Sequence, residues 1–383
     1  MLMQKKVWAM KVLHVNMSMN TRTGGGTVER ILQLHKALLA MGAESHILTI
    51  NSLGSNHANL PANEVTTLPC LNERWLIPYP KIAIVRSLIE WADVIHLSNH
   101  WTLINTVVYL LARKLEKPYF VCPAGALTIY GRSKILKRAY QYLVGKRLIK
   151  NAAAAIAISP DEIEQFSALG VSKGKIIHIP NGVNEEDFAH PDVKGFREVL
   201  GLVDLPYILF LGRLNAIKGP DLLLKAFIAL SDAIPHVLVF VGPDGGMLEE
   251  LEVLADDNGL KERVFFAGFA GGDLKAGAYS GADVLVVPSR HEAMSIVALE
   301  AAISGVPVLM TDQCGFQELV HAGAALEVSA TEEGVIDGLR NMLVAQCQLE
   351  IMGQKGKKFA QERFTWEIAA EKYLSIFTKV RGS

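Results

Sequence analysis

The sequence predicts an α/β protein made of two doubly wound domains, each built on its own parallel sheet. Short apolar runs typical of buried strands alternate with stretches of helical periodicity along the whole chain. The chain has 383 residues, of which 50% are hydrophobic, and this is enough for two cores. Residues 1–190 carry 21 Lys and Arg against 13 Asp and Glu, whereas the remainder carries 17 against 26. The opposite charges of the two halves favour two units with different partners.

The first half begins with an apolar run from Met10 to Val15, which is typical of a first strand. Further apolar runs alternate with helical stretches, and this order implies a parallel sheet with helices on both faces. We expect strands at residues 11–16, 45–50, 93–97, 118–122, 153–158 and 175–179, with helices at about 27–41, 82–91, 103–116, 134–150 and 160–169.

The second half repeats the pattern. The apolar run from Tyr207 to Leu211 predicts a buried strand, and Gly219-Pro220 predicts a helix start, because proline is favoured in the first helical turn. We expect strands near 207–211, 236–241, 263–267, 283–287, 306–310 and 324–328, with helices at 220–232, 247–257, 272–280, 294–304 and 332–346 and a helical tail to 381.

The domain boundary is expected within residues 182–200, where turn-forming residues interrupt a charged stretch. The expected domains are residues 1–185 and 195–365, followed by a last helical segment, 366–383. In such sheets ligands bind at the carboxyl ends of the strands, so the residues that follow each strand are the candidates for a site.

The loop after the strand 207–211 carries two cations. Gly212 lets the chain turn close to a ligand, and Arg213 and Lys218 then project from the loop just before the helix at Gly219-Pro220. Arginine as a fork and lysine as a point charge suit a diphosphate group. A solvated basic loop is the alternative interpretation.

Two carboxylates lie eight residues apart after the apolar run that ends at Pro288. Glu292 is expected on the loop and Glu300 in the following helix, and eight residues of helix span roughly 12 Å. That is about the span from a ribose across a diphosphate to an attached sugar, and the amides at the helix start between the two acids suit the diphosphate. Solvated acids on a helix face are the alternative interpretation.

Together, the two motifs resemble the retaining, nucleotide-sugar-dependent glycosyltransferases of family 4, also called group 1. That family has a Gly-Arg…Lys-Gly loop followed about 75 residues later by a Glu-x7-Glu motif. Asn181-Gly182-Val183, Gly242-Pro243-Asp244-Gly245 and Phe364-Thr365-Trp366-Glu367 also resemble it. The resemblance implies the GT-B fold, in which two Rossmann-like domains face a cleft and the last helix crosses back to the first, acceptor-side domain.

The resemblance also implies roles for individual residues. Arg213 and Lys218 would neutralise the departing diphosphate, Glu292 would hold sugar hydroxyls, and Glu300 would hold the ribose. The glycine-rich loop Thr23–Thr27 would border the donor, although it is also an ordinary flexible loop and lacks the fingerprint of NAD sites. The remaining donor-side candidates are Gly25, Gly26, Gly268, Phe269, Ser295 and Ile296.

His100 follows the strand 93–97 and is the acceptor-side candidate, while a histidine satisfied by hydrogen bonds at a domain edge is the alternative. Family members commonly place a histidine after the next strand, where this chain has Ala124. The glycines that often follow the first glutamate are replaced by Ala293, Met294 and Ser295. These departures bear on the identity of the sugar more than on the reaction.

Composition and spacing exclude several other classes. Cys70, Cys122, Cys314 and Cys347 are scattered, which predicts reduced thiols in a cytoplasmic protein. No metal site is expected, since Asp-x-Asp is absent and no zinc spacing occurs. We expect neither a signal peptide nor a membrane-spanning helix. A sequence pI near 6.8 argues against nucleic-acid binding.

The segment 132–150 carries seven cations and no acid, with apolar residues at helical spacing. It predicts either a peripheral contact with anionic lipid at the inner face of the membrane or a basic, solvated helix face.

The predicted function is retaining transfer from a UDP- or GDP-linked sugar to a glycan or lipid-linked acceptor, in surface polysaccharide synthesis and without a cofactor. The alternatives are a nucleotide-sugar epimerase and a non-catalytic nucleotide-sugar-binding protein. The base, sugar, acceptor, linkage and oligomeric state are left open.

Overall fold

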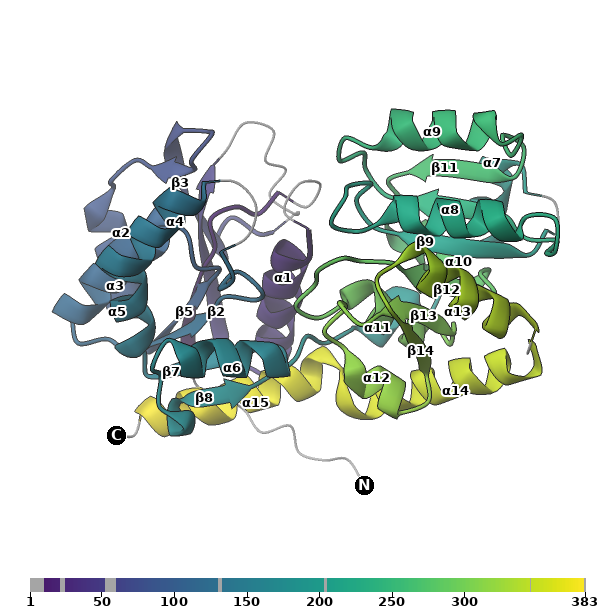
Figure 1. Cartoon of the computed structure of the whole chain (residues 1–383). Coiled ribbons are helices and arrows are strands. Elements are labelled where there is room, and N and C mark those ends of the chain that lie inside the picture. The colour runs from purple at the N-terminus through teal and green to yellow at the C-terminus, as the bar shows by residue number, and fades with distance from the viewer. Residues whose placement is uncertain are drawn as a thin grey trace, which may run out of the picture. The chain divides into compact units, whose positions relative to one another are not determined.

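The computed structural model describes residues 10–20, 25–51, 60–129, 133–202, 205–344 and 346–381. The chain forms two compact units, of which the first comprises residues 1–182 and 366–383 and the second comprises residues 183–365 (Figure 1). The first unit is therefore completed by the last helix of the chain.

The first unit is built on a sheet whose strands, in the described residues, follow the order β4-β3-β2-β1-β5-β6-β7-β8. Every neighbouring pair is parallel except β3 and β4, which run antiparallel. The strands are β1 (Lys11–Val15), β2 (Glu44–Asn51), β3 (Val65–Asn72), β4 (Ile77–Pro78), β5 (Val94–Ser98), β6 (Tyr119–Cys122), β7 (Ala154–Ala157) and β8 (Ile176–His178).

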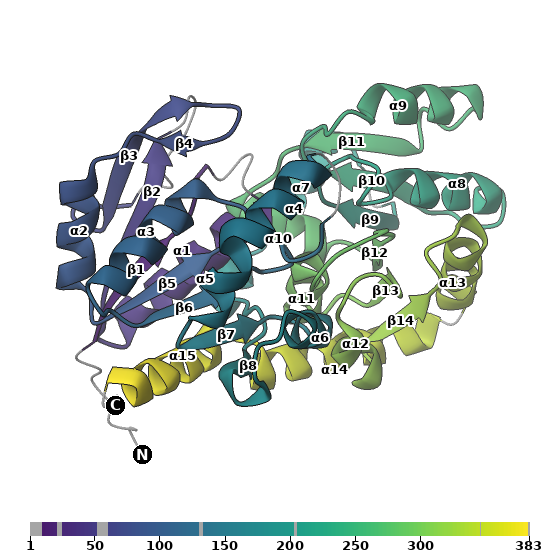
Figure 2. The same cartoon turned by 60° about the vertical axis from the view of Figure 1, so that its left-hand side comes forward.

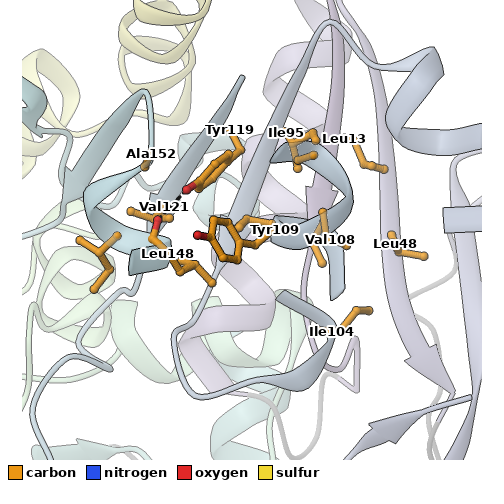
Figure 3. Packing of buried hydrophobic residues seen from close by; sticks show 14 of the residues in the cluster. Leu13, Leu48, Ile95, Ile104, Val108, Tyr109, Tyr119, Val121, Leu148 and Ala152 are labelled. Carbon is orange, nitrogen blue, oxygen red and sulfur yellow. Dashed lines mark hydrogen bonds between the residues drawn. The ribbon is translucent and has the colours of Figure 1, made fainter. Parts of the chain in front are cut away.

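Helices cover both faces of this sheet (Figure 1). The larger core lies on the face covered by α2, α3 and α6, where the Tyr119 hydroxyl donates a hydrogen bond to the carbonyl of Leu148 at 2.8 Å (Figure 3). The helices of the unit are α1 (Gly25–Ala40), α2 (Ile82–Trp91), α3 (Leu103–Lys114), α4 (Lys134–Tyr140), α5 (Lys146–Lys150), α6 (Pro160–Ala168) and α15 (Trp366–Arg381), with a π-helical turn at Gln141–Gly145 and a 3-10 turn at Lys173–Lys175.

The opposite face of the first sheet is covered by α1 and α15, and it holds a buried polar layer. The Arg30 guanidinium donates hydrogen bonds to the Tyr373 hydroxyl at 2.6 Å and to the side chain of Asn181. The imidazoles of His14 and His96 contact each other through their Nδ1 atoms at 2.9 Å. Arg30 of α1 thus connects this helix to α15 and to Asn181, near the point where the chain leaves the first unit.

The second unit has an all-parallel sheet in the order β11-β10-β9-β12-β13-β14. Its strands are β9 (Tyr207–Leu211), β10 (Val237–Val241), β11 (Val264–Gly268), β12 (Val284–Val287), β13 (Val308–Thr311) and β14 (Ala325–Val328). Its helices are α7 (Val193–Leu200), α8 (Pro220–Leu230), α9 (Leu248–Asp257), α10 (Gly272–Ser280), α11 (Ile296–Ile303), α12 (Gln317–His321), α13 (Glu332–Val344) and α14 (Gln346–Arg363), with a 3-10 turn at Glu185–Phe188.

The predicted α/β class with two parallel sheets is confirmed, and the differences are local. Strands β3 and β4, at the edge of the first sheet (Figure 2), were not predicted, because β3 contains Pro69 and is only partly buried. Helix α7 lies where a linker was expected and buries only Phe196. The single helix expected at 134–150 contains the π-helical turn, where a Cβ added to Gly145 would lie 2.9 Å from the His100 ring.

Candidate active site

The candidate site in the second unit lies at the carboxyl edge of the sheet, where three loops follow neighbouring strands. Because β9 pairs with both β10 and β12, the residues that follow these strands share one edge. The loops are joined by main-chain contacts, since Gly212 N–H bonds to Val241 and Leu214 N–H bonds to Pro243 at 3.0 Å. Arg213 lies between these two anchor points.

The loop after β9 is shaped by its own residues. The Asn215 side chain accepts hydrogen bonds from the amides of Ile217 and Lys218 at 3.1 and 3.0 Å. Gly219 then adopts a left-handed φ of +68°, and a Cβ there would lie 2.1 Å from the Pro288 carbonyl oxygen. Only glycine fits where this loop presses on the end of β12.

Lys218 and Glu292 are in direct contact. The Lys218 Nζ atom lies 2.9 Å from Glu292 Oε1, and the same oxygen accepts a short hydrogen bond from the Ser289 hydroxyl. The Glu292 side chain is only 8% exposed, whereas that of Lys218 is 32% exposed. A hydrogen bond from the Glu292 amide to the Gln313 carbonyl anchors the acidic loop to the end of β13. One cation and one carboxylate are therefore held together at this edge.

Glu300 lies in α11, which is capped by the Ser295 hydroxyl accepting a hydrogen bond from the Ala298 amide. The Glu300 carboxylate is nearly buried and accepts hydrogen bonds from Lys275 and from the Tyr279 hydroxyl, both at 2.8 Å. Burial and the adjacent Glu300 charge raise the pKa of Tyr279 well above its usual value, so its hydroxyl remains a donor.

Lys275 and Tyr279 were not predicted as site residues. They lie four residues apart in α10, a spacing that places them on one helix face. This spacing was the available signal, but nothing in the sequence indicates that their partner is a carboxylate on α11.

The predicted base-bordering residues lie at the end of β11. Gly268 has a left-handed φ of +65°, and its carbonyl accepts a hydrogen bond from the Gly242 amide at 2.7 Å. The Phe269 side chain that follows is 63% exposed. An accessible aromatic ring thus follows the strand beside β10.

Three sequence candidates belong to the first unit. Gly25 and Gly26 begin α1, whereas Thr23 and Gly24 lie outside the described residues. His100 is buried after β5, where its Nε2 atom contacts the Gln141 side chain at 2.6 Å. Burial lowers the pKa of His100 to about 4 against a smaller opposing effect of Gln141, so the imidazole is neutral at pH 7.

Ala124, the residue at the usual histidine position, has a left-handed φ of +50° after β6. Such a conformation is uncommon for a residue other than glycine. In the part of the chain that the structure describes, no group of three His, Cys, Asp or Glu side chains is placed to hold a metal ion. No helix of those same residues is long and apolar enough to cross a bilayer.

Family models match both units. The model described as "Glycosyl transferase 4-like domain" matches residues 25–182, and the model described as "Glycosyl transferases group 1" matches residues 193–359. A D-inositol 3-phosphate glycosyltransferase of Xylanimonas cellulosilytica is 26% identical over 402 residues, covering 94% of this chain and 93% of the relative.

A second relative is the GDP-mannose-dependent alpha-(1-6)-phosphatidylinositol monomannoside mannosyltransferase of Mycolicibacterium smegmatis, which is 32% identical over 233 residues and 58% of this chain. The chain spans 61% of that relative, and it spans less than two thirds of several other curated relatives that it matches.

Among solved structures, the complex of Anabaena Alr3699/HepE with UDP and glucose has a TM-score of 0.81 at 18% identity, covering 97% of this chain and all of that one. This likeness confirms the expected GT-B fold. Since one family model matches each unit, the chain belongs to the family 4, or group 1, glycosyltransferases.

Proposed function

We propose that this chain is a retaining glycosyltransferase that moves a sugar from a UDP- or GDP-linked donor to a glycan or lipid-linked acceptor, in surface polysaccharide synthesis. The observation that carries the proposal is the contact of Lys218 with Glu292, on the sheet edge where Arg213 opens the same loop. A cation suited to a phosphate and a carboxylate suited to sugar hydroxyls are thus adjacent.

The proposed chemistry breaks the bond between the anomeric carbon and the donor diphosphate and forms a bond from that carbon to an acceptor hydroxyl oxygen, whose proton passes to the departing diphosphate. Arg213 and Lys218 stabilise the negative charge that develops on the diphosphate, and they act without reorganisation because their loop is held in place. Glu292 binds hydroxyls of the transferred sugar. Glu300 binds the ribose hydroxyls, since each carboxylate oxygen that Lys275 or Tyr279 occupies retains a further lone pair.

The other predicted site residues complete the proposal. The amides at the start of α11 face the diphosphate, and the residues after β11 border the base. His100, whose imidazole is neutral at pH 7, contacts the acceptor in this proposal. The main-chain contributors are Gly25, Gly26, Gly268, Phe269, Ser295 and Ile296.

The relatives support this choice of donor and acceptor classes. One is named as GDP-mannose-dependent and acts on a phosphatidylinositol mannoside, and a structural neighbour is recorded with UDP and glucose. Another neighbour, WaaG, is described as involved in lipopolysaccharide biosynthesis. The test below identifies the nucleotide base and the sugar of the donor that this protein uses.

The test is a panel of UDP- and GDP-sugars, first scored by thermal stabilisation and then by transfer to glycan and lipid-linked acceptors. Proton NMR of the product reads the anomeric configuration, and we expect it to match that of the donor. A product of inverted configuration would refute the retaining assignment. Conversion of the donor to an isomer without any acceptor would indicate an epimerase, and binding without turnover would indicate a non-catalytic protein.

We further propose that this protein is cytoplasmic and that the segment 132–150 contacts anionic lipid at the inner face of the membrane. Its described part carries six cations and no acid, and Arg132 lies outside the described residues. Large apolar side chains are exposed among these cations, with Ile135 81% and Tyr142 85% exposed. Exposed apolar and aromatic groups within a cationic surface are typical of interfacial helices.

Co-sedimentation with vesicles tests this contact. We expect binding to vesicles that contain phosphatidylglycerol, little binding to phosphatidylcholine alone, and loss of binding in Ile135→Ser/Tyr142→Ser and in Lys137→Glu/Arg138→Glu. The control is Lys358→Glu, an exposed cation of α14. Equal binding of all variants would refute a contact through 132–150, and dimerisation that these changes abolish would assign the surface to a second copy.

A further inference from the structure

Arg290 joins the two loops that carry the candidate charges. Its guanidinium donates two hydrogen bonds to the Asp221 carboxylate, at 2.8 and 2.6 Å, and a third to the Ala216 carbonyl at 2.8 Å. Its own amide bonds to the Ile217 carbonyl at 2.7 Å. Side chain and main chain of one residue therefore hold the loop after β9 against the loop after β12.

This connection brackets the Lys218–Glu292 contact in sequence. Arg290 lies two residues before Glu292, and Asp221 lies three residues after Lys218. Between them Gly219 touches Pro288, as described above. A shift of either loop would therefore separate the ammonium from the carboxylate.

The ion pair between Arg290 and Asp221 has a more defined geometry than a typical surface ion pair. It is bidentate, and the Asp221 side chain is only 17% exposed. Burial raises the pKa of Asp221, but the hydrogen bonds and charge of Arg290, together with smaller effects of the Asp221 amide and the Lys225 charge, outweigh it and hold the pKa below its usual value. Bidentate arginine–carboxylate pairs fix geometry as well as adding energy, which suits a role in alignment.

We propose that Arg290 is a positioning residue for the transfer reaction: paired with Asp221, it aligns Lys218 for the β-phosphate of the donor. The inference rests on the proposed function, because it assigns Lys218 to the diphosphate. A misplacement of about 1 Å in a catalytic group is enough to cost roughly 100-fold in rate. Arg290 therefore matters through Lys218 and not through a contact of its own with the donor.

The test is a double-mutant cycle on nucleotide binding, with UDP, GDP, UMP and GMP as probes in isothermal titration. We expect Lys218→Met and Arg290→Ala each to weaken binding of the preferred diphosphate about tenfold or more, as lost charge-assisted hydrogen bonds do, and to change monophosphate binding little. We expect the double variant to bind no more weakly than Lys218→Met alone, because Arg290 acts through Lys218.

Conservative variants separate alignment from folding. Arg290→Lys, which loses the bidentate pair, and Asp221→Asn are expected to lie between wild type and Arg290→Ala in diphosphate affinity, with unchanged circular dichroism. The control is Arg340→Ala, which removes an exposed pair with Asp337 on α13 and should bind like wild type.

The outcomes separate the positioning role of Arg290 from the assignment of Lys218 to the diphosphate. If Arg290→Ala weakens diphosphate binding equally in the wild type and in Lys218→Met, Arg290 contacts the donor itself and the positioning role is refuted. The positioning role is also refuted if all Arg290 and Asp221 variants bind the diphosphates like wild type. If Lys218→Met itself binds the diphosphates normally, the leaving-group assignment fails and the positioning role fails with it.

Discussion

Lowering the pH from 7 to 5 should destabilise the first unit through its buried histidines. His96 and His100 are 0% and 1% exposed, and among the residues that the structure describes neither ring is paired with a carboxylate. Burial, with the nearby charge of Arg30 as a smaller cause, lowers the pKa of His96 to about 3. Burial lowers the pKa of His100 to about 4. Both imidazoles are therefore neutral in the folded protein at pH 5.

The sign and size of this loss of stability follow from proton linkage. Unfolded histidine titrates near pH 6.5, so the unfolded chain binds more protons below that pH and the folded state loses stability as the pH falls. The contribution of these two neutral histidines to the stability of the folded state is complete above about pH 6.5. It declines as the pH falls, until the pH reaches their folded-state pKa values. Each imidazole that stays neutral should lower the free energy of unfolding by about 2 kcal/mol between pH 7 and pH 5, and the two together should lower it by about 4 kcal/mol. That is a large part of the usual stability of a domain.

The assay can isolate the first unit, because all five tryptophans fall within its residue ranges. Urea unfolding followed by tryptophan fluorescence should give the free energy of unfolding at both pH values. The double variant His96→Gln/His100→Gln retains the other titrating groups, so the difference between the two pH dependences reports the loss of these two imidazoles together with its effect on His14, which contacts His96. We expect the loss between pH 7 and pH 5 to be about 4 kcal/mol smaller in the variant. Equal losses in the two proteins would refute the reasoning.

Three further changes test the packing around the sites. Gly219→Ala should destabilise the second unit by more than Gly201→Ala in circular dichroism melts, because both glycines are left-handed but only Gly219 faces a carbonyl, and equal costs would refute the close contact. Glu300→Gln should weaken UDP or GDP binding several-fold but leave 2′,3′-dideoxy analogues unaffected, and a uniform loss would argue against a ribose contact. Arg30→Met should cost about 2–4 kcal/mol in the fluorescence-detected unfolding of the first unit, because it removes the buried hydrogen bonds that Arg30 donates to Tyr373 and Asn181. An unchanged midpoint would contradict this.

Periodicity and turn residues predicted the two sheets because they are local signals. The strand 207–211 and the helix start at Pro220 are both present, and the helix runs from Pro220 to Leu230. Lys218 and Glu292 were paired in advance only through the order of motifs along the chain. Their direct contact depends on β9 lying beside β12, which local pattern does not reveal.

The features that were missed depend on distant parts of the chain. Lys275 meets Glu300 through the packing of two helices, and Arg290 meets Asp221 across two loops. In sequence each of these cations is indistinguishable from a solvated surface charge. The edge strand β3 lacks a continuous apolar run because it is only partly buried. Contacts of this kind become visible only when the strand order is known.

The most direct test of the central claim is the rate of sugar transfer by Arg213→Ala and Lys218→Ala, measured with the donor that the nucleotide-sugar panel selects. If these two cations stabilise the departing diphosphate, we expect both variants to lose transfer by at least about 100-fold, as for other preorganised charges in active sites. Their circular dichroism should remain that of wild type, which shows that the fold is intact. Wild-type transfer rates in both variants would contradict the account.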